Sequence, residues 1–326
     1  MRSSLRTNLR DSFFGQWILP ILIALPLSIA IEKAFDAIFD ITLSKWIELS
    51  IYLGCYLLVH RIINANTIES NAEPHPATNW PVSGPIRSVG NYGLFLVFFS
   101  TSLLTILNPF LFIQQIRQVV GLASAFRCVN KNAAHFRNYK TKVSYQYPFS
   151  GKWLIFNGGY VPQTSHSWNQ IAQRYAFDFV KADSADYSRH LNNGTKVTDY
   201  FCYNQPICAA AAGEVVTVYN KCATAPLVGF GVADFLCTHI AGNHIVIKHA
   251  DGEYGFYAHL IKGSIKVKVG DTVAQGQVIG RCGHSGMSSE PHLHFHLQDR
   301  ADFFSAVGLP LEFNEERKER GSFVEQ

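Results

Sequence analysis

Three histidines alternate with apolar residues in one short run near the C-terminus, at His292, His294 and His296. Successive side chains of a β-strand point to opposite faces, so this spacing puts the three imidazoles on one face and Leu293 and Phe295 on the other. Imidazole nitrogen is a common zinc ligand, and neighbouring positions on one strand face can converge on a single ion. The run predicts a metal site on a strand, with an exposed polar strand face as the alternative.

A second alternating segment isolates one carboxylate. Tyr175, Phe177 and Phe179 fall on one face of an expected strand, and Asp178 falls on the other. A tetrahedral zinc site needs ligands from more than one segment, and aspartate oxygen is among the ligands that zinc accepts. A lone aspartate on a strand is also typical of a solvated sheet edge, so both interpretations of Asp178 stay open at this point.

Other catalytic motifs are incomplete or absent. The segment starting at Gly283 departs from the nucleophile elbow G-x-S-x-G at Met287, and the helical zinc motif H-E-x-x-H does not occur. The segment VKVGDTVAQGQVIG is similar to the turn of biotinyl and lipoyl carriers, but it has no lysine at the hairpin tip. A serine hydrolase, a helix-borne zincin and a cofactor carrier are therefore excluded.

The elements that must position these residues are short strands. From Ala211 onwards, β-branched and aromatic runs alternate with Gly and Asp, as in GEVVTVY, GNHIVIKH and GEYGFYAHL, which predicts an antiparallel β domain. No G-x-G-x-x-G or Walker loop is present, so a nucleotide-binding fold is not expected. We expect His244, His249 and His296 to lie at an edge or behind the site rather than to bind metal.

The order of these segments resembles the lysostaphin-like (LytM-type) zinc metallopeptidases over roughly positions 150–315, from His166 through QRYAFDF and FYAHL to GHSGMSSEPHLHFHL. The resemblance implies that His166, Asp178 and His294 hold Zn2+ and leave a fourth position for water, as catalytic zinc sites do. One departure concerns spacing, because well-known members have the first histidine and the aspartate closer together than the twelve residues here. A longer loop would be needed.

The resemblance also implies that His259 and His292 are catalytic residues that do not bind the metal. One would take the proton of the attacking water and the other would stabilise the oxyanion, and the sequence leaves open which does which. The implied activity is a zinc metalloendopeptidase acting on peptides of bacterial cell-wall peptidoglycan. The alternatives are a non-catalytic wall-binding regulator of other hydrolases and a peptidase of secreted peptides.

The first third of the chain is apolar and poor in charge. Ser12 to Ile31 and Ser88 to Ile116 carry no charged residue, and a shorter run from Leu49 to Val59 lies between them. A membrane-spanning helix needs about 20 mostly apolar residues, so we expect about three transmembrane helices. With the N-terminus inside, three spans predict a multi-pass protein of the bacterial cytoplasmic membrane whose catalytic domain is extracytoplasmic.

The sequence therefore predicts a mainly β, lysostaphin-like C-terminal peptidase domain of antiparallel sheets, preceded by an α-helical transmembrane region. The expected parts are a membrane region at 1–116, a juxtamembrane linker at 117–143, the zinc peptidase domain at 144–314 and a charged tail at 315–326. A formal net charge of +4, with no Lys/Arg run interleaved with aromatics, speaks against nucleic acid as a partner. Seven cysteines without a C-x-x-C pair give no zinc knuckle and leave disulfide pairing open.

Overall fold

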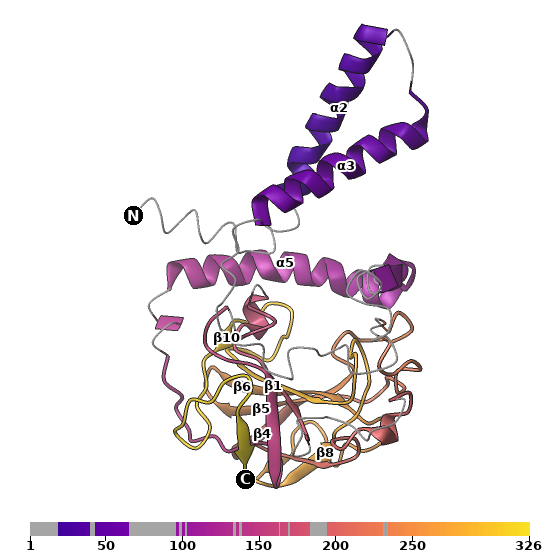
Figure 1. The fold of residues 1–326 in the computed structure, drawn as a ribbon. Coiled ribbons are helices and arrows are strands. Elements are labelled where there is room, and N and C mark those ends of the chain that lie inside the picture. The colour runs from indigo at the N-terminus through magenta and orange to yellow at the C-terminus, as the bar shows by residue number, and fades with distance from the viewer. Residues whose placement is uncertain are drawn as a thin grey trace. The chain divides into compact units, whose positions relative to one another are not determined.

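The chain forms two compact units in the computed structural model, Met1–Ala72 and Glu73–Gln326 (Figure 1). The described part of the first unit consists of two helices that pack on each other, α2 (Leu19–Phe39) and α3 (Lys45–Asn64). The structure describes residues 19–39, 43–64, 96–97, 100–101, 103–132, 135–136, 139–162, 164–168, 170–182, 194–230, 232 and 234–326.

The prediction of a multi-pass membrane protein, with about three transmembrane helices, is wrong for the described part of the chain. None of the helices there combines the length and the apolar character that a membrane crossing needs. The physical reason lies in the charges, because α2 continues beyond the apolar run and takes in Glu32, Lys33 and Asp36, while α3 contains Lys45, Glu48 and Arg61. The predicted location of the domain outside the cytoplasmic membrane depended on three spans, so it is not supported either.

Parts of the expected spans lie outside the described residues, namely 12–18 of the first and 88–95, 98–99 and 102 of the third. The end of the third expected span lies instead in helix α5 (Pro109–Lys131), which follows a 3-10 turn, η4 (Thr105–Leu107). Asn108 caps α5, since its side chain accepts hydrogen bonds from the backbone amides of Phe110 and Leu111, and Pro109 occupies the first turn.

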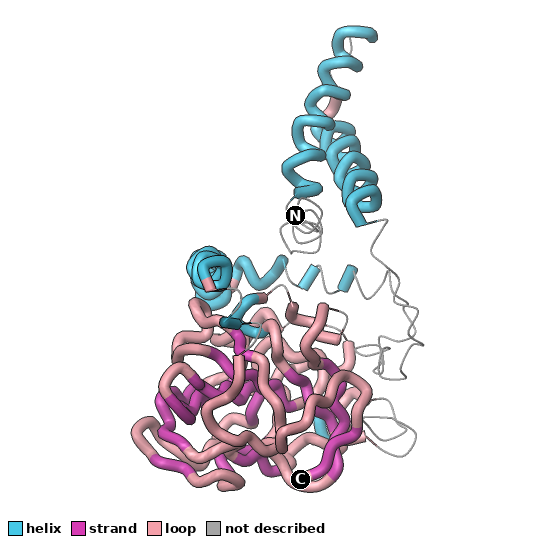
Figure 2. Tube along the Cα trace, turned by 90° about the vertical axis from the view of Figure 1, so that its left-hand side faces the viewer, coloured by secondary structure: helices cyan, strands magenta, loops and turns pink. Residues whose placement is uncertain are grey.

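Helix α5 is attached to the β-rich part of the second unit, and Figures 1 and 2 both show it along one side of that part. The Asn108 amide donates hydrogen bonds to the carbonyls of Phe235 and Cys237, each at 2.9 Å. Further along the helix, the Arg117 guanidinium lies 3.0 Å from Asp302 Oδ1 and over the Phe304 ring. The helix therefore contacts the domain through polar and aromatic side chains.

The second unit is built on a nine-stranded sheet in which every strand pair is antiparallel, as predicted. The order is β11-β1-β2-β9-β6-β5-β4-β7, with β10 beside β9. The strands are β1 (Lys152–Asn157), β2 (Phe177–Val180), β4 (Gly213–Tyr219), β5 (Asn243–Ala250), β6 (Glu253–Leu260), β7 (Thr272–Val273), β9 (Leu293–Gln298), β10 (Gly308–Leu309) and β11 (Phe323–Glu325). A separate pair joins β3 (Pro206–Cys208) to β8 (Val278–Arg281), and 3-10 turns lie at η5 (Ile171–Gln173) and η6 (Val197–Asp199).

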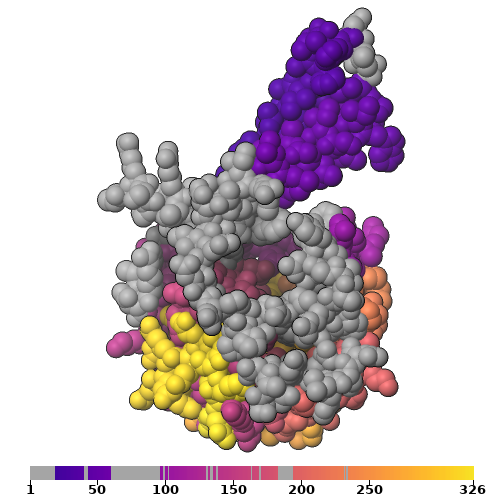
Figure 3. Space-filling view, in the orientation of Figure 1, coloured from indigo at the N-terminus to yellow at the C-terminus, as the bar shows by residue number. Residues whose placement is uncertain are grey.

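Strand β11 belongs to the segment 315–326 and forms one edge of the sheet. It pairs with β1 through Val324, which lies opposite Trp153. The C-terminal segment, yellow in Figure 3, accordingly forms part of the surface of the second unit.

All seven cysteines are free thiols.

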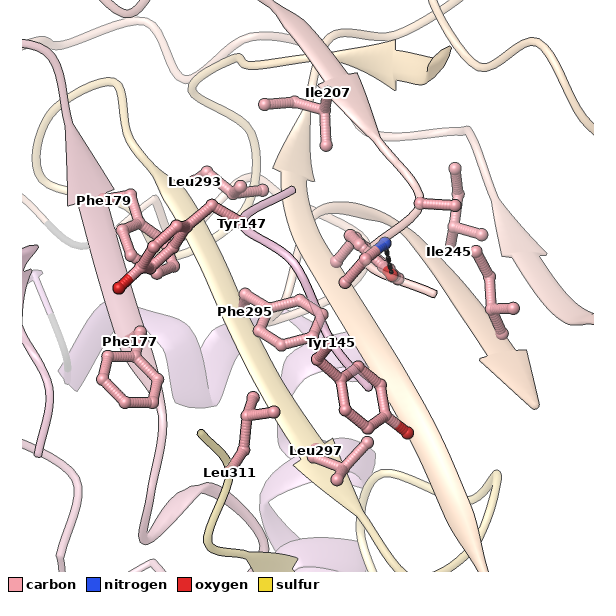
Figure 4. Close-up of a cluster of buried hydrophobic side chains, with 14 of the residues drawn as sticks. Tyr145, Tyr147, Phe177, Phe179, Ile207, Ile245, Leu293, Phe295, Leu297 and Leu311 are labelled. Carbon is pink, nitrogen blue, oxygen red and sulfur yellow. Dashed lines mark hydrogen bonds between the residues drawn. The ribbon is translucent and has the colours of Figure 1, made fainter. Parts of the chain in front are cut away.

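One face of the sheet holds the main apolar core. Figure 4 shows Phe177 and Phe179 of β2 beside Leu293, Phe295 and Leu297 of β9, and all five side chains are fully buried. Because side chains alternate, the same two strands must carry their polar residues on the opposite face. The pairing of β2 with β9 sets Asp178 directly opposite His294. The apolar core thus determines which face receives the candidate site.

We predict that Phe295→Ala lowers the free energy of unfolding of the second unit by about 3–5 kcal/mol, the usual cost of deleting a buried aromatic ring. Chemical denaturation followed by near-ultraviolet circular dichroism measures the change. Leu236→Ala is the matched control, because Leu236 is 66% exposed and its loss should cost less than about 0.5 kcal/mol. Equal effects of the two substitutions would show that the β9 face is not the core.

Candidate metal centre

Three predicted ligands converge on one point of the polar sheet face. Candidate ligand atoms of His166, Asp178 and His294 all lie within 4.8 Å of one another. Asp178 stands between the two imidazoles, with Oδ2 3.3 Å from His166 Nε2 and Oδ1 2.9 Å from His294 Nδ1. Among the residues that the structure describes, this is the only group of His, Cys, Asp or Glu side chains with a geometry suited to a metal ion.

His166 reaches this point through a folded loop between β1 and β2. The Ser165 hydroxyl donates a hydrogen bond to the Arg174 carbonyl at 2.8 Å, and the Ser167 hydroxyl donates one to the Gln173 carbonyl at 2.6 Å. Both serines are buried. They tie the residues on either side of His166 to the segment just before β2, so the twelve-residue separation from Asp178 is closed by the loop itself.

The electrostatic state of the cluster suits a cation. Burial alone would raise the pKa of Asp178, but His166, His292 and His294 outweigh burial and hold that pKa far below its ordinary value. Desolvation lowers the pKa of His166 and of His292, so these rings readily give up a proton to a cation that takes its place beside the carboxylate. An ionised carboxylate with neutral ring nitrogens is the protonation state that metal binding requires. The donor set of two nitrogens and one oxygen fits a zinc site with a position left for water.

His259 and His292 lie beside the cluster with their rings 4.6 Å apart. His259 Nδ1 lies 2.8 Å from the Ser285 carbonyl oxygen, and His292 Nδ1 lies 2.7 Å from the Glu290 carbonyl oxygen. A carbonyl only accepts, so each Nδ1 carries the hydrogen and each neutral ring keeps its lone pair on Nε2. His292 Nε2 lies 3.7 Å from Asp178 Oδ1.

The environment of these two rings keeps them uncharged. Burial, and for His259 also the neighbouring His292 and His294, lowers both pKa values. His259 has φ 61°, a left-handed conformation that is uncommon for a non-glycine residue and is found at functional sites. The structure thus brings together all five residues that the sequence singled out, with two basic Nε2 atoms next to the candidate ligands.

Three further residues support the cluster and were not predicted to act there. Asn157, the last residue of β1, donates a hydrogen bond from Nδ2 to Asp178 Oδ2 at 3.2 Å. His296 Nδ1 lies 3.0 Å from His294 Nε2, and His296 Nε2 lies 2.9 Å from Gln298 Oε1. The available signals were a polar residue closing the apolar run KWLIFN and the continued alternation of β9. The sequence had placed His296 at an edge or behind the site.

The two histidines of strand β5, His244 and His249, lie away from the metal centre. His244 stacks between Tyr219 and Phe256, with ring centroids at 5.4 and 4.9 Å, and its Nδ1 contacts the Gly242 carbonyl. His249 Nδ1 lies 3.0 Å from the Ala212 carbonyl oxygen. Neither belongs to the three-residue cluster.

Residues 193–305 match the model of peptidase family M23. This chain carries a peptidase M23 domain. The match covers His259, His292 and His294, while His166 and Asp178 lie before it. The match confirms the predicted lysostaphin-like family for this domain, and the His/Asp/His cluster has a geometry suited to a metal ion.

The M23 domain is similar to several curated proteins. Peptidoglycan DD-endopeptidase ShyA of Vibrio cholerae is 36% identical over 182 residues, which cover 53% of this chain and 38% of ShyA. Lysostaphin of Staphylococcus simulans is 49% identical over 73 residues, 22% of this chain and 14% of that protein. The chain therefore spans well under two thirds of the length of either relative. Among solved structures, a zinc-containing peptidase from Vibrio cholerae matches at 21% identity with a TM-score of 0.32, covering 52% of this chain and 41% of that one.

We predict that acid lowers the free energy of unfolding of the M23 domain through protonation of His244 and His239. Burial lowers their pKa values to about 4 and about 3, from 6.5. Above pH 6.5 both states hold neutral rings, so these groups add no pH dependence. Between pH 6.5 and 4 the unfolded chain binds the protons first, so the free energy of unfolding falls as the pH falls. The contribution of His244 is on the order of 2–3 kcal/mol at pH 4.

Denaturant titrations at pH 7.5, 6, 5 and 4 measure this loss. His244→Phe is the comparison variant, because a phenyl ring keeps the stack with Tyr219 and Phe256 and cannot bind a proton. Its free energy of unfolding should fall less steeply with acid than that of the wild type. Parallel pH profiles of the two proteins would contradict the assignment.

Proposed function

We propose that this chain is a zinc-dependent endopeptidase that hydrolyses peptide bonds of bacterial cell-wall peptidoglycan. The observation that carries the proposal is the placement of two Nε2 lone pairs, on His259 and His292, beside a His/Asp/His cluster suited to zinc. The names of similar proteins supply the substrate class, since ShyA is called a peptidoglycan DD-endopeptidase. Lysostaphin is also among the similar proteins.

In this proposal His166, Asp178 and His294 hold the ion. Zinc bound there would polarise the scissile carbonyl and lower the pKa of water enough for attack near neutral pH. Asn157 keeps the Asp178 carboxylate in place through its hydrogen bond to Oδ2. Because Asp178 is 3% exposed and receives no Lys or Arg contact among the described residues, its charge is left for the cation.

The two other histidines handle the proton. Nδ1 of each is occupied by a backbone carbonyl, so a proton taken from the attacking water must go to Nε2 of one of them. The resulting imidazolium is a donor at Nε2, and it can stabilise the developing negative charge or pass the proton to the leaving amine. Both rings are buried, which limits competition from solvent.

The alternatives differ from this proposal in ways that can be observed. A wall-binding regulator without activity needs neither the ligands nor the two basic nitrogens, and here all five side chains stand together. A peptidase of secreted peptides would share the site but not the substrate. Purified peptidoglycan, digested and examined for released peptides by mass spectrometry, separates the three.

We predict that Asp178→Ala and His294→Ala each lose bound zinc and hydrolysis, because each removes one of three protein ligands. Zinc is measured by mass spectrometry of the metal after dialysis against a weak chelator. His135→Ala serves as the control, since His135 is an exposed histidine outside the cluster, and it should keep full zinc. Stoichiometric zinc in either variant would contradict the assignment of that residue as a zinc ligand.

We predict that His259→Ala and His292→Ala keep the metal but lose at least about 100-fold in turnover, the usual contribution of positioned proton transfer. Release of peptides from purified peptidoglycan by zinc-loaded protein gives the rate, and zinc content is measured on the same samples. Metal loss in these variants would mean that ligands and catalysts have been exchanged. Failure of the wild-type protein to release any peptide would reject peptidoglycan as the substrate.

A further inference from the structure

Two of the cysteines, Cys202 and Cys282, lie on neighbouring backbone segments of the apolar core. Both are fully buried and belong to the main core cluster. Cys202 begins a turn in which Gln205 N donates a hydrogen bond to the Cys202 carbonyl at 3.2 Å. Cys282 pairs with the end of that turn, because its N donates to the Gln205 carbonyl at 2.9 Å and its carbonyl accepts from Asn204 N at 2.8 Å. The backbone therefore sets Cys282 beside the turn.

The side chain of Cys202 points towards the segment that contains Cys282. Its Sγ donates a hydrogen bond to the Pro291 carbonyl at 2.9 Å, and Pro291 lies at the bridge of Gly283 with His292, next to Cys282. The thiols of Cys202 and Cys282 also share a hydrogen bond. A disulfide needs two cysteines on neighbouring backbone whose side chains face each other. This pair has both features.

The third cysteine near this turn is too far away to take part. Cys208 lies on β3 opposite Val278 of β8, four residues before Cys282. Extended residues rise about 3.3 Å each, so Cys208 lies roughly 13 Å from Cys282 along the strand pair. A disulfide spans at most about 7 Å between Cα atoms. Cys208 is thus a natural control for the pair.

The burial of the pair limits when a bond between the two sulfurs can form. Burial, together with the contact with Cys202, raises the pKa of the Cys282 thiol. Thiolates are the species that attack a disulfide, so the thiols of the folded core react slowly. The bond must therefore form while the chain folds, before the core closes. The same burial then shields the finished bond from reductants.

We propose that Cys202 and Cys282 form a stabilising disulfide when the chain folds in the presence of a disulfide oxidant such as glutathione disulfide. One cysteine attacks a glutathione sulfur, releases one glutathione and forms a mixed disulfide. The second cysteine attacks the sulfur of the first and releases the other glutathione. Each glutathione that leaves carries one cysteine proton, so two thiols are oxidised and one glutathione disulfide is reduced. The proposal depends neither on zinc nor on hydrolysis.

The bond would connect the turn at Cys202 to the start of a segment that matters for the candidate site. Cys282 directly precedes residues 283–291, in which the carbonyls of Ser285 and Glu290 accept hydrogen bonds from the two proposed catalytic histidines. A crosslink between distant positions of the chain restricts the unfolded state. We therefore expect the bond to make the domain more resistant to denaturant.

Peptide mapping tests the bond directly. The full chain is unfolded, reduced and refolded with oxidised and reduced glutathione, and the remaining thiols are blocked in denaturant at acid pH before digestion with trypsin. The expected product joins residues 197–221 to residues 282–300. Its mass should be two hydrogens below the sum of the separate peptides, and a reductant should split it. Recovery of both peptides only as blocked thiols would overturn the proposal.

Variants identify the two cysteines. The peptide 197–221 also contains Cys208, so Cys208→Ala is the matched control and should keep the joined product. Cys202→Ser should lose the joined product, while its hydroxyl can still donate to the Pro291 carbonyl as the thiol does. A joined product that persists in Cys202→Ser and is lost in Cys208→Ala would overturn the pairing.

Unfolding in guanidinium chloride measures the consequence. For the wild type and Cys208→Ala, we expect a higher midpoint after refolding with glutathione than after refolding with a reductant. The rise should disappear in Cys202→Ser. A rise of equal size in Cys202→Ser, or no rise in the wild type, would contradict the stabilising role. Circular dichroism of each sample shows whether the fold has been kept.

Discussion

The structure depends on one pairing, the antiparallel contact of β2 with β9 that puts Asp178 opposite His294. Each strand alternates, so the residues that flank these two, Phe177, Phe179, Leu293 and Phe295, enter the apolar core. A slip of one residue would move the carboxylate into the core and a phenylalanine to the site. The hydrophobic core and the metal-binding geometry are thus set by the same register, and neither can change alone.

Around this pairing, backbone carbonyls that can only accept hydrogen bonds fix the tautomers of the proposed catalytic histidines. Backbone carbonyls at Ser285 and Glu290 fix the tautomers of His259 and His292. Strand alternation predicted that His292 and His294 share one face, and the resemblance to the lysostaphin-like family added His166 and His259 to them. The sequence could not predict the tautomers, since the carbonyls that decide them come from the irregular segment between β8 and β9, whose path no periodicity reveals.

The rest of the prediction follows the same division between local pattern and tertiary contact. The antiparallel β domain and its lysostaphin-like family were predicted from short motifs and are confirmed. The approach of His166 to Asp178 was the uncertain point, and it depends on two buried serines that bind carbonyls several residues away. The membrane prediction was wrong because it ended a helix where the apolar run ends, whereas α2 continues through Glu32, Lys33 and Asp36.

Strand β11 links distant residues to the carboxylate at the centre of the site. It pairs with β1, and β1 ends in Asn157, which holds Asp178 by a hydrogen bond. Residues 323–325 therefore help to align the carboxylate, although two strand pairings, β11 with β1 and β1 with β2, separate them from Asp178. Proteolytic trimming of these residues, or a bulky fusion that pulls them from β1, would act on the site through these pairings and without touching a single ligand.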